Sequence, residues 1–289
     1  MSKRILGLWN MGDGTFHRKL SPRESKEIIK TALKNGIRSF DTAFSYHEAD
    51  SMLRSALREA GKKRDDIEII SKVMPVPSLA KKAEASLRRL GTDHVDVLLL
   101  HWPSDDKSIY GSLRKLESLM DSGRCLSIGV SNFPFSLLEK AASDFPIAYH
   151  ERPLSLIWNK DWEKEKSLNL RTLAYAPLGM GLLSLRYRKQ SDLGDCRKDL
   201  FAWHSDDFYK LLDYMSTLEC SASGAALSWV ENEKPYGIIQ GAGKKTDIMT
   251  ESTVLSAEEL GMLSGYAERI TAAAPSDNIF SHNYATITP

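Results

Sequence analysis

Short runs rich in aliphatic and β-branched residues alternate with longer amphipathic stretches along this 289-residue chain. Strands that alternate with helices indicate βα units and a parallel sheet, an arrangement of the α/β class. Eight such units in a chain of this length can close into a (β/α)8 TIM barrel. The eight predicted strands occupy residues 5–9, 37–40, 67–73, 95–100, 125–130, 147–151, 170–175 and 236–240.

The helices are predicted from their apolar stripes and from residues that favour helix ends. In the first helix Ser21 can act as the N-cap, Pro22 suits the first helical position, and Glu24 can complete a capping box. Asn35 and Gly36 tolerate the left-handed conformation and are expected to end that helix. Further helices are predicted over about residues 48–60, 78–90, 108–122, 135–143, 161–168, 206–218 and 222–232.

The glycines after the first strand argue against the rival fold, an open dinucleotide-binding sheet. That fold needs Gly-x-Gly-x-x-Gly at the start of a helix, whereas Met11-Gly12-Asp13-Gly14 lacks the third glycine and precedes no immediate helix. The chain length also allows two domains, but α/β barrels use about 250 residues as one domain. Because no linker or repeat interrupts the chain, we expect one barrel domain over residues 1–289.

One predicted connection is unusually long. It runs from Pro177 to about Ser205 and contains the segment Leu178-Gly179-Met180-Gly181-Leu182. A connection of this length is more often a lid or a binding loop than a plain link.

Charge and cysteine content narrow the expected partners. The formal net charge of +1 gives no electrostatic reason to expect nucleic acid or an anionic membrane surface. No apolar run approaches the roughly 18 residues that span a bilayer, and residues 1–6 lack the apolar core of a secretion signal. Cys125, Cys196 and Cys220 form no Cys-x-x-Cys pair, so we expect no disulfide framework, no metal site and a cytoplasmic location.

Proton-active side chains stand at the ends of three neighbouring predicted strands. Asp41 ends the second strand, and Tyr46 follows it shortly afterwards. Lys72 stands near the end of the third strand, and His101 follows the fourth. Each residue alone is equally consistent with a turn cap, packing or solvated surface. A barrel gathers the carboxyl ends of its strands at one rim, so these four side chains are expected to converge there.

Five segments of the chain form a distinctive series in sequence order. They are Gly36-Ile37-Arg38-Ser39-Phe40-Asp41-Thr42-Ala43 with Tyr46, Ser71-Lys72, Val95-Asp96-Val97-Leu98-Leu99-Leu100-His101-Trp102-Pro103, Ile128-Gly129-Val130-Ser131-Asn132-Phe133, and Ala174-Tyr175-Ala176-Pro177-Leu178-Gly179. This series resembles the aldo-keto reductase family. The resemblance extends from about residue 20 to residue 252 and implies an NAD(P)-dependent oxidoreductase that acts on a small-molecule carbonyl substrate.

The resemblance implies a catalytic tetrad of Asp41, Tyr46, Lys72 and His101. An unperturbed tyrosine has a pKa of about 10 and is a poor acid–base group at neutral pH. A neighbouring Lys72 would favour the phenolate, and Asp41 would hold that lysine and balance its charge. His101 can donate a hydrogen bond to the substrate oxygen, while Tyr46 supplies the proton.

The resemblance also implies residues that hold the cofactor, NADP(H). Ser131 and Asn132 would bind the carboxamide, and Tyr175 would stack on the nicotinamide ring. Gly241, Lys244 and Lys245 follow the eighth strand and would cradle the adenosine side. The alternatives remain open: a strand-to-helix turn for the Ser-Asn pair, core packing for the tyrosine, and solvated surface for the two lysines.

Two positions depart from the family pattern. Glu151 stands where a carboxamide-binding Gln is usual, and its negative charge would favour the oxidised, cationic nicotinamide unless Arg152 or His150 neutralises it. Asp247 stands where an Arg often binds the 2′-phosphate of NADP, although Lys244 and Lys245 can compensate. NADP(H) is therefore expected, with NAD(H) as the alternative.

Several alternatives to a carbonyl reductase stay open. The same residues suit an NAD-preferring sugar (aldose) dehydrogenase, a cofactor-sensing regulatory barrel bound to a membrane partner, or a barrel that binds cofactor without turnover. The second would be indicated by a long N-terminal extension, which is not expected here. Four aromatic residues can line the substrate mouth or pack in the core: Trp9, Phe44, Trp102 and Trp158.

Overall fold

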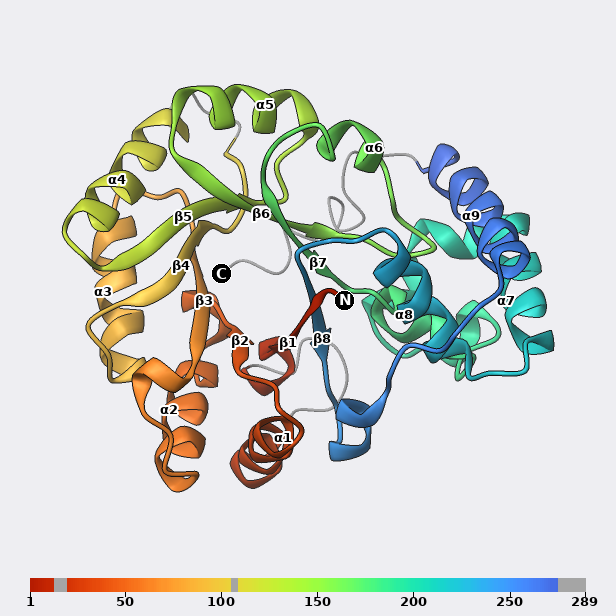
Figure 1. Cartoon of the computed structure of the whole chain (residues 1–289), viewed down its shortest axis with the longest axis horizontal. Coiled ribbons are helices and arrows are strands. Elements are labelled where there is room, and N and C mark those ends of the chain that lie inside the picture. The colour runs from red at the N-terminus through yellow and green to blue at the C-terminus, as the bar shows by residue number, and fades with distance from the viewer. Residues whose placement is uncertain (13–19, 105–108, 275–289) are drawn as a thin grey trace.

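The computed structural model describes residues 1–12, 20–104 and 109–274. Eight parallel strands pair in sequence order, and the last pairs with the first, so the predicted (β/α)8 TIM barrel is confirmed (Figure 1). The strands are β1 (Lys3–Gly7), β2 (Ser39–Asp41), β3 (Glu68–Val73), β4 (Val95–Leu100), β5 (Cys125–Ser131), β6 (Ile147–Pro153), β7 (Arg171–Tyr175) and β8 (Gly237–Gly241).

Helices surround the barrel, as Figure 1 shows. The first begins with the predicted capping box, in which the Ser21 side chain accepts a hydrogen bond from the backbone N–H of Glu24, and Gly36 follows it with φ of +80°. The helices are α1 (Pro22–Lys34), α2 (Ala49–Glu59), α3 (Leu79–Leu90), α4 (Ile109–Asp121), α5 (Phe135–Asp144), α6 (Trp162–Glu165), α7 (Asp206–Thr217), α8 (Ala222–Asn232) and α9 (Ala257–Ala272).

The largest differences from the predicted elements lie at the first strand and at two helices. The strand expected at 5–9 is shifted to Lys3–Gly7, because Trp9 begins a 3-10 turn. The helix expected at 161–168 is reduced to α6, and α9 was not predicted at all. Two predicted features fall partly outside the described residues: the helix start at Ser108 and the second glycine of the early pair, Gly14.

Apolar side chains fill the barrel below the rim and confine the polar groups to one end. Gly129 on β5 allows this close packing, because a Cβ there would lie 2.3 Å from the carbonyl oxygen of Tyr149. The interior cluster consists of Ile5, Ile70, Val97, Leu99, Tyr149, Leu173 and Ile239. The mouth at the carboxyl ends of the strands is therefore where a barrel of this kind can bind a ligand.

The long connection after β7 is a series of short 3-10 turns rather than an extended flap. Its residues Leu182, Leu183 and Trp203 are buried, and the side chain of Arg197 is held by two hydrogen bonds to Asp195. Its first part lines the cavity described below. In the described part of the chain, no helix combines the length and the apolar character needed to span a bilayer.

Candidate active site

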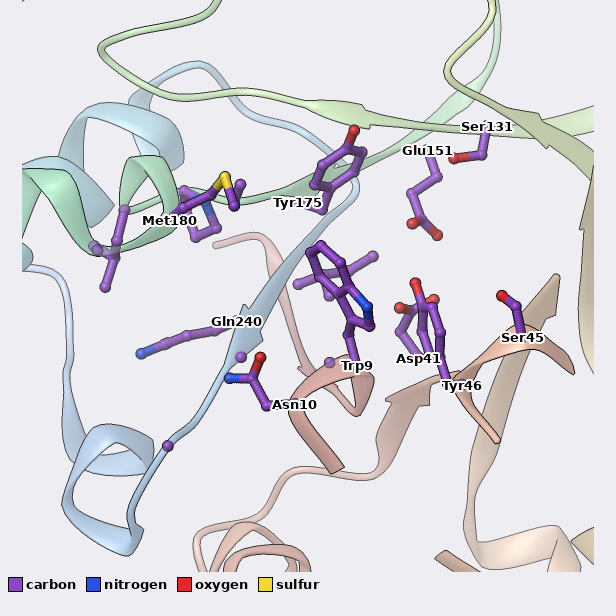
Figure 2. A pocket seen from close by; sticks show the side chains of 18 of the residues that line it. Trp9, Asn10, Asp41, Ser45, Tyr46, Ser131, Glu151, Tyr175, Met180 and Gln240 are labelled. Atoms are coloured by element: carbon purple, nitrogen blue, oxygen red, sulfur yellow. The ribbon is translucent and has the colours of Figure 1, made fainter. Parts of the chain in front are cut away.

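A cavity of about 900 Å³ opens at the carboxyl ends of the strands. Its volume is typical of small-molecule and cofactor sites. Figure 2 shows Asp41, Tyr46 and Glu151 directed toward the same part of this cavity, with Trp9 and Tyr175 beside them. The predicted site residues that line it are Asp41, Tyr46, His101, Ser131, Asn132, Glu151, Tyr175, Gly241 and Lys244.

Tyr46 lies in a 3-10 turn, Phe44–Tyr46, between β2 and α2. The neighbouring Gly12 must lack a side chain, since a Cβ there would lie 2.4 Å from the carbonyl oxygen of Tyr46. On the other side the ring of Trp9 stacks on the tyrosine, with centroids 6.3 Å apart and an interplanar angle of 25°. Close packing on two sides therefore fixes the phenol at the cavity wall.

A buried polar network that the sequence did not reveal holds the Tyr46 turn in place. The carboxylate of Asp50 on α2 is fully buried and accepts a 2.8 Å hydrogen bond from the Thr42 hydroxyl. Arg89 on α3 forms an ion pair of 2.9 Å with Asp50 and donates a 2.8 Å hydrogen bond to the carbonyl oxygen of Phe44. The network thus connects two helices to Thr42 and Phe44, which lead into the tyrosine.

Lys72, on β3, is 1% exposed and is not itself a lining residue of the cavity, but it lies behind three residues that are, Asp41, Tyr46 and Glu151. Its ammonium lies 2.5 Å from Asp41 Oδ2, donates to the carbonyl oxygen of Thr42 at 3.1 Å, and stands 5.2 Å from the ring centroid of Tyr46. Burial disfavours the charge, but the carboxylates of Asp41 and Glu151 outweigh that effect and raise the pKa of Lys72. The lysine is therefore a permanent cation next to the phenol.

The phenol itself keeps its proton. Burial raises the pKa of Tyr46 above its ordinary value, and the attraction of Lys72 offsets this only in part. The expected influence of the lysine is present, but it does not produce a phenolate in the protein alone. A protonated phenol against a cation is suited to giving a proton to an oxygen that gains negative charge.

His101 follows β4 and is held beside Tyr46. The two rings meet edge to face with centroids 5.7 Å apart and an interplanar angle of 74°. The hydroxyl of Ser45 lies 3.4 Å from Nδ1 of the histidine. Burial and the nearby charge of Lys72 lower the pKa of His101 well below its ordinary value, so the imidazole is neutral at physiological pH.

Ser131, Asn132 and Tyr175 form a connected group on the opposite wall. The Tyr175 hydroxyl donates a 2.6 Å hydrogen bond to Asn132 Oδ1, and Asn132 Nδ2 donates to Ser131 Oγ at 2.9 Å and to the carbonyl oxygen of His101 at 3.0 Å. Asn132 adopts a left-handed φ of +63°, which asparagine tolerates better than most residues. The three hydrogen bonds hold the side-chain amide at the cavity wall.

Glu151 lies on β6, across the barrel from Asp41, and is 3% exposed. Its Oε1 is 3.2 Å from the ammonium of Lys72, whereas its Oε2 has no hydrogen-bond partner among the described residues. The pairing with Lys72 was not foreseen from the sequence. Burial, together with the negative charge of Asp41, raises the pKa of Glu151 well above its ordinary value despite Lys72.

The loop after β8 places only part of the predicted adenosine site at the cavity. Gly241 and Lys244 line it, whereas the ammonium of Lys245 lies outside, 4.0 Å from Glu27 on α1, with its side chain 61% exposed. Asp247 Oδ2 accepts hydrogen bonds from the backbone N–H groups of Gly243 at 2.9 Å and Lys244 at 3.1 Å.

A cation that lines the mouth together with Lys244 was not predicted from the sequence. Arg186, from the long connection after β7, lines the cavity, and its guanidinium lies 3.4 Å from Asp247 Oδ1. Its position depends on the fold of a connection without a recognisable motif, so no local signal indicated it.

The four aromatic candidates separate into two groups. Trp9, Phe44 and Trp102 line the cavity. Trp158 is 1% exposed and packs edge to face against Phe201, with centroids 5.8 Å apart, so it belongs to the core. Among the described residues no cluster of His, Cys, Asp and Glu is arranged to hold a metal ion.

The donor set fits a nicotinamide cofactor. The hydroxyl of Ser131 and the unpartnered Glu151 Oε2 offer hydrogen-bonding groups to a carboxamide, and an aromatic ring stands beside them. At the other end Lys244 and Arg186 supply positive charge for phosphate groups. This barrel has a cavity with a phenol beside a cation, an imidazole and groups suited to a nicotinamide cofactor. Such a site is characteristic of nicotinamide-dependent oxidoreductases that act on carbonyl and alcohol groups.

The chain belongs to the aldo/keto reductase family, whose family model matches residues 4–261. Members of this family are NAD(P)-dependent oxidoreductases that act on carbonyl and alcohol groups. Among curated proteins, it is similar to a 6-dehydroglucose reductase of Agrobacterium fabrum, with 31% identity over 63% of this chain and 70% of that protein. It is also similar to a glyoxal reductase of Bacillus subtilis, with 34% identity over 55% of this chain and 60% of that protein.

Solved structures show the same architecture over almost the whole chain. A thermostable aldo-keto reductase in complex with the inhibitor epalrestat is 25% identical, with a TM-score of 0.73 over 92% of this chain and 95% of that chain. A glycerol dehydrogenase from Gluconobacter oxydans is 23% identical, with a TM-score of 0.78 over 94% and 93% of the two chains. The second likeness concerns the fold alone.

Proposed function

We propose that this protein interconverts a small carbonyl compound and its alcohol, with Tyr46 as the acid in reduction and the base in oxidation. The observation that carries the proposal is the buried chain Asp41–Lys72–Tyr46 beside His101 at the cavity. When bound, the nicotinamide supplies or accepts the hydride. The protein then has to orient the carbonyl, exclude water and move one proton.

Each residue of the tetrad has a distinct role in that work. Tyr46 gives its proton to the carbonyl oxygen as negative charge develops there, and Lys72 stabilises the phenolate that remains. Asp41 holds the lysine in place through its 2.5 Å contact. His101 is neutral, and to donate to the substrate oxygen it must carry its hydrogen on Nε2; Nδ1 is then free to accept from the Ser45 hydroxyl 3.4 Å away.

The substrate is a small aldehyde, ketone or sugar. Trp9, Phe44 and Trp102 give the mouth of the cavity an apolar aromatic character. Curated relatives include a 6-dehydroglucose reductase, a glyoxal reductase and a morphine 6-dehydrogenase, which is consistent with a carbonyl or alcohol substrate and with either direction of reaction. An aldose dehydrogenase working in the oxidative direction is the variant to test beside the reductase.

For the cofactor we propose NADP(H). Ser131, Asn132, Glu151 and Tyr175 would hold the nicotinamide end, and Gly241 with Lys244 the adenosine end. Arg186 supports the phosphate-bearing cofactor, because it adds a second cation at the mouth where Lys245 is absent.

NAD(H) is the second candidate, and one observation favours it. The carboxylate of Asp247 already accepts hydrogen bonds from the N–H groups of Gly243 and Lys244, which are donors that a 2′-phosphate would otherwise use. A carboxylate at that place is a better neighbour for a ribose hydroxyl than for a phosphate.

The decisive experiment compares the wild type with Tyr46→Phe on a panel of aldehydes, ketones and sugars with NADPH and NADH. Turnover should fall by roughly 10²- to 10⁴-fold while cofactor binding persists, because only the proton donor is removed. Tyr209→Phe, at a 37% exposed tyrosine on α7, is the matched control and should retain activity.

Two outcomes would contradict the proposal. Undiminished turnover by Tyr46→Phe would show that another group supplies the proton. Cofactor binding without turnover in the wild type would favour a regulatory barrel.

A further inference from the structure

The cavity floor holds one more acidic side chain than the nearby cation can balance. Asp41 and Glu151 both approach the ammonium of Lys72, at 2.5 Å and 3.2 Å. All three side chains are buried, with exposures of 3%, 3% and 1%. With both carboxylates ionised the cluster carries a net charge of −1 out of contact with bulk water, which is costly.

In the part of the chain that the structure describes, Lys72 is the cation that pairs with Glu151. Among the described residues, the titratable groups on its side are Asp41 from β2, Tyr46 from the turn after β2, Lys72 from β3 and His101 after β4. The neighbouring residues His150 and Arg152 pair instead with Glu165 of α6, at 3.0 Å and 2.5 Å. The sequence alone allowed these two residues to neutralise Glu151, but both are engaged by Glu165.

The two carboxylates are not equivalent, and the weaker partner of the lysine is Glu151. Asp41 has the shorter contact and a hydrogen bond from the ammonium, whereas Glu151 has the longer contact and an oxygen, Oε2, without any hydrogen-bond partner among the described residues. Of the two carboxyls, Glu151 is therefore the better site for the proton that relieves the excess charge. The raised pKa of this carboxyl agrees with the geometry.

From this geometry we infer that Glu151 is the residue that distinguishes oxidised from reduced cofactor, by releasing one proton to solvent when the oxidised form binds. The inference rests on the proposed function, which places the nicotinamide beside Glu151. The oxidised ring is a cation and supplies the missing positive charge, so the carboxylic acid ionises to a carboxylate and a proton. The reduced ring is neutral and leaves the carboxylic acid intact. No electrons are exchanged in this step.

A proton released on binding makes affinity depend on pH. The affinity for the oxidised cofactor should rise by up to tenfold per pH unit while Glu151 is protonated in the unbound protein, whereas the affinity for the reduced cofactor should stay nearly constant. Rising pH would therefore shift the cavity toward the oxidised cofactor and toward oxidation of alcohols.

The experiment is isothermal titration calorimetry with NADP⁺ and with NADPH, at one pH, in buffers that differ in ionisation enthalpy. The apparent enthalpy then gives the number of protons released. The 2′-phosphate is common to both ligands, so its own titration cancels in the difference.

The wild type should release up to one more proton with NADP⁺ than with NADPH. Glu151→Gln should show no difference, and Glu163→Gln, at a carboxylate 81% exposed on α6, should behave like the wild type.

The outcomes separate the inference from the proposed function. Equal proton release for both cofactors in the wild type, or a difference that persists in Glu151→Gln, overturns the inference while leaving the oxidoreductase intact. Absence of binding by either cofactor overturns the proposed function instead. If Glu151→Gln does not fold, the wild type alone decides: dissociation constants for the two cofactors that change in parallel with pH contradict the inference.

Discussion

The hydroxyl of Tyr175 donates a 2.6 Å hydrogen bond to Oδ1 of Asn132, which joins the aromatic ring at the cavity to the amide beside it. The same amide is held from its nitrogen side by Ser131 and by the carbonyl oxygen of His101. The amide orientation is therefore set by the protein before any ligand arrives.

Tyr175→Phe should keep the ring but lose this tether. We expect cofactor affinity to fall about threefold to tenfold, in line with about 1 kcal/mol for a neutral hydrogen bond. Tyr175→Ala removes the ring as well and should weaken binding further. Fluorescence titration with NADPH measures both, and an equal loss in the two variants would mean that the tether, not the ring, carries the contribution.

The neutral state of His101 predicts the acid side of the pH profile. An ordinary histidine would gain a proton near pH 6.5, but burial and Lys72 lower the pKa of His101 well below that value. We therefore expect kcat/KM for carbonyl reduction to show no break between about pH 6 and 7. Initial rates with subsaturating substrate test this, and a break in that range that disappears in His101→Asn would contradict it.

The Asp50–Arg89 pair should matter for stability as well as for activity. Asp50→Ala removes a fully buried carboxylate and leaves the hydroxyls of Thr42 and Ser86 and the guanidinium without their acceptor. Loss of one partner of a buried pair costs about 3 kcal/mol or more of unfolding free energy. Since Arg89 is 29% exposed, we expect the lower end of that range.

Urea unfolding followed by circular dichroism measures this loss. Asp93→Asn is the matched control, because that carboxylate is 83% exposed and its removal should change the unfolding free energy by less than about 0.5 kcal/mol. The Asp50 variant should also lose kcat/KM, since the turn that carries Tyr46 loses its support. Equal stability of the two variants would show that the buried network contributes little.

The barrel and the position of its tetrad were predictable from local signals. Alternating strands and helices indicate a parallel barrel, and such a barrel brings strand ends together, so Asp41, Lys72 and His101 had to share a rim. The unpredicted helix α9 also had a local signal, the capping box of Ser256 and Glu259, which the structure confirms.

The contacts that distinguish this chain were not predictable in the same way. The approach of Glu151 to Lys72 joins β6 to β3 across the barrel mouth, and its length depends on side-chain conformations that no sequence pattern encodes. The pair of Asp50 and Arg89 likewise joins two helices, and each residue alone is typical of a solvated helix face. Arg186 reaches the cavity only through the fold of an irregular connection.

Arg186 provides a test of the cofactor preference. If it binds the 2′-phosphate, Arg186→Ala should weaken NADPH binding by roughly threefold to tenfold, because a charge-assisted hydrogen bond at a 60% exposed side chain is partly screened by solvent. NADH, which lacks that phosphate, should be affected less. Arg188→Ala is the control, since Arg188 is 45% exposed and pairs with Asp213 of α7. If Arg186→Ala weakens the binding of NADPH and NADH equally, Arg186 does not bind the 2′-phosphate.

The surplus acidic group at Glu151 also has a consequence for the unliganded protein. Its pKa in the folded state lies well above the ordinary value of 4.5, so above pH 4.5 the folded state binds more protons than the unfolded state. The slope of unfolding free energy against pH is then negative, and the contribution of this group is fully present below pH 4.5 and lost as pH rises.

Glu151→Gln does not titrate and keeps the pair of Lys72 and Asp41. The variant should therefore gain stability relative to the wild type as pH rises from about 5 to 8, by at most about 1.4 kcal/mol per pH unit. Thermal unfolding of both proteins across that range measures the gain. Other titrating groups are common to both proteins and cancel, so a difference that stays constant with pH would mean that Glu151 is ionised throughout and that the floor of the cavity tolerates the extra charge.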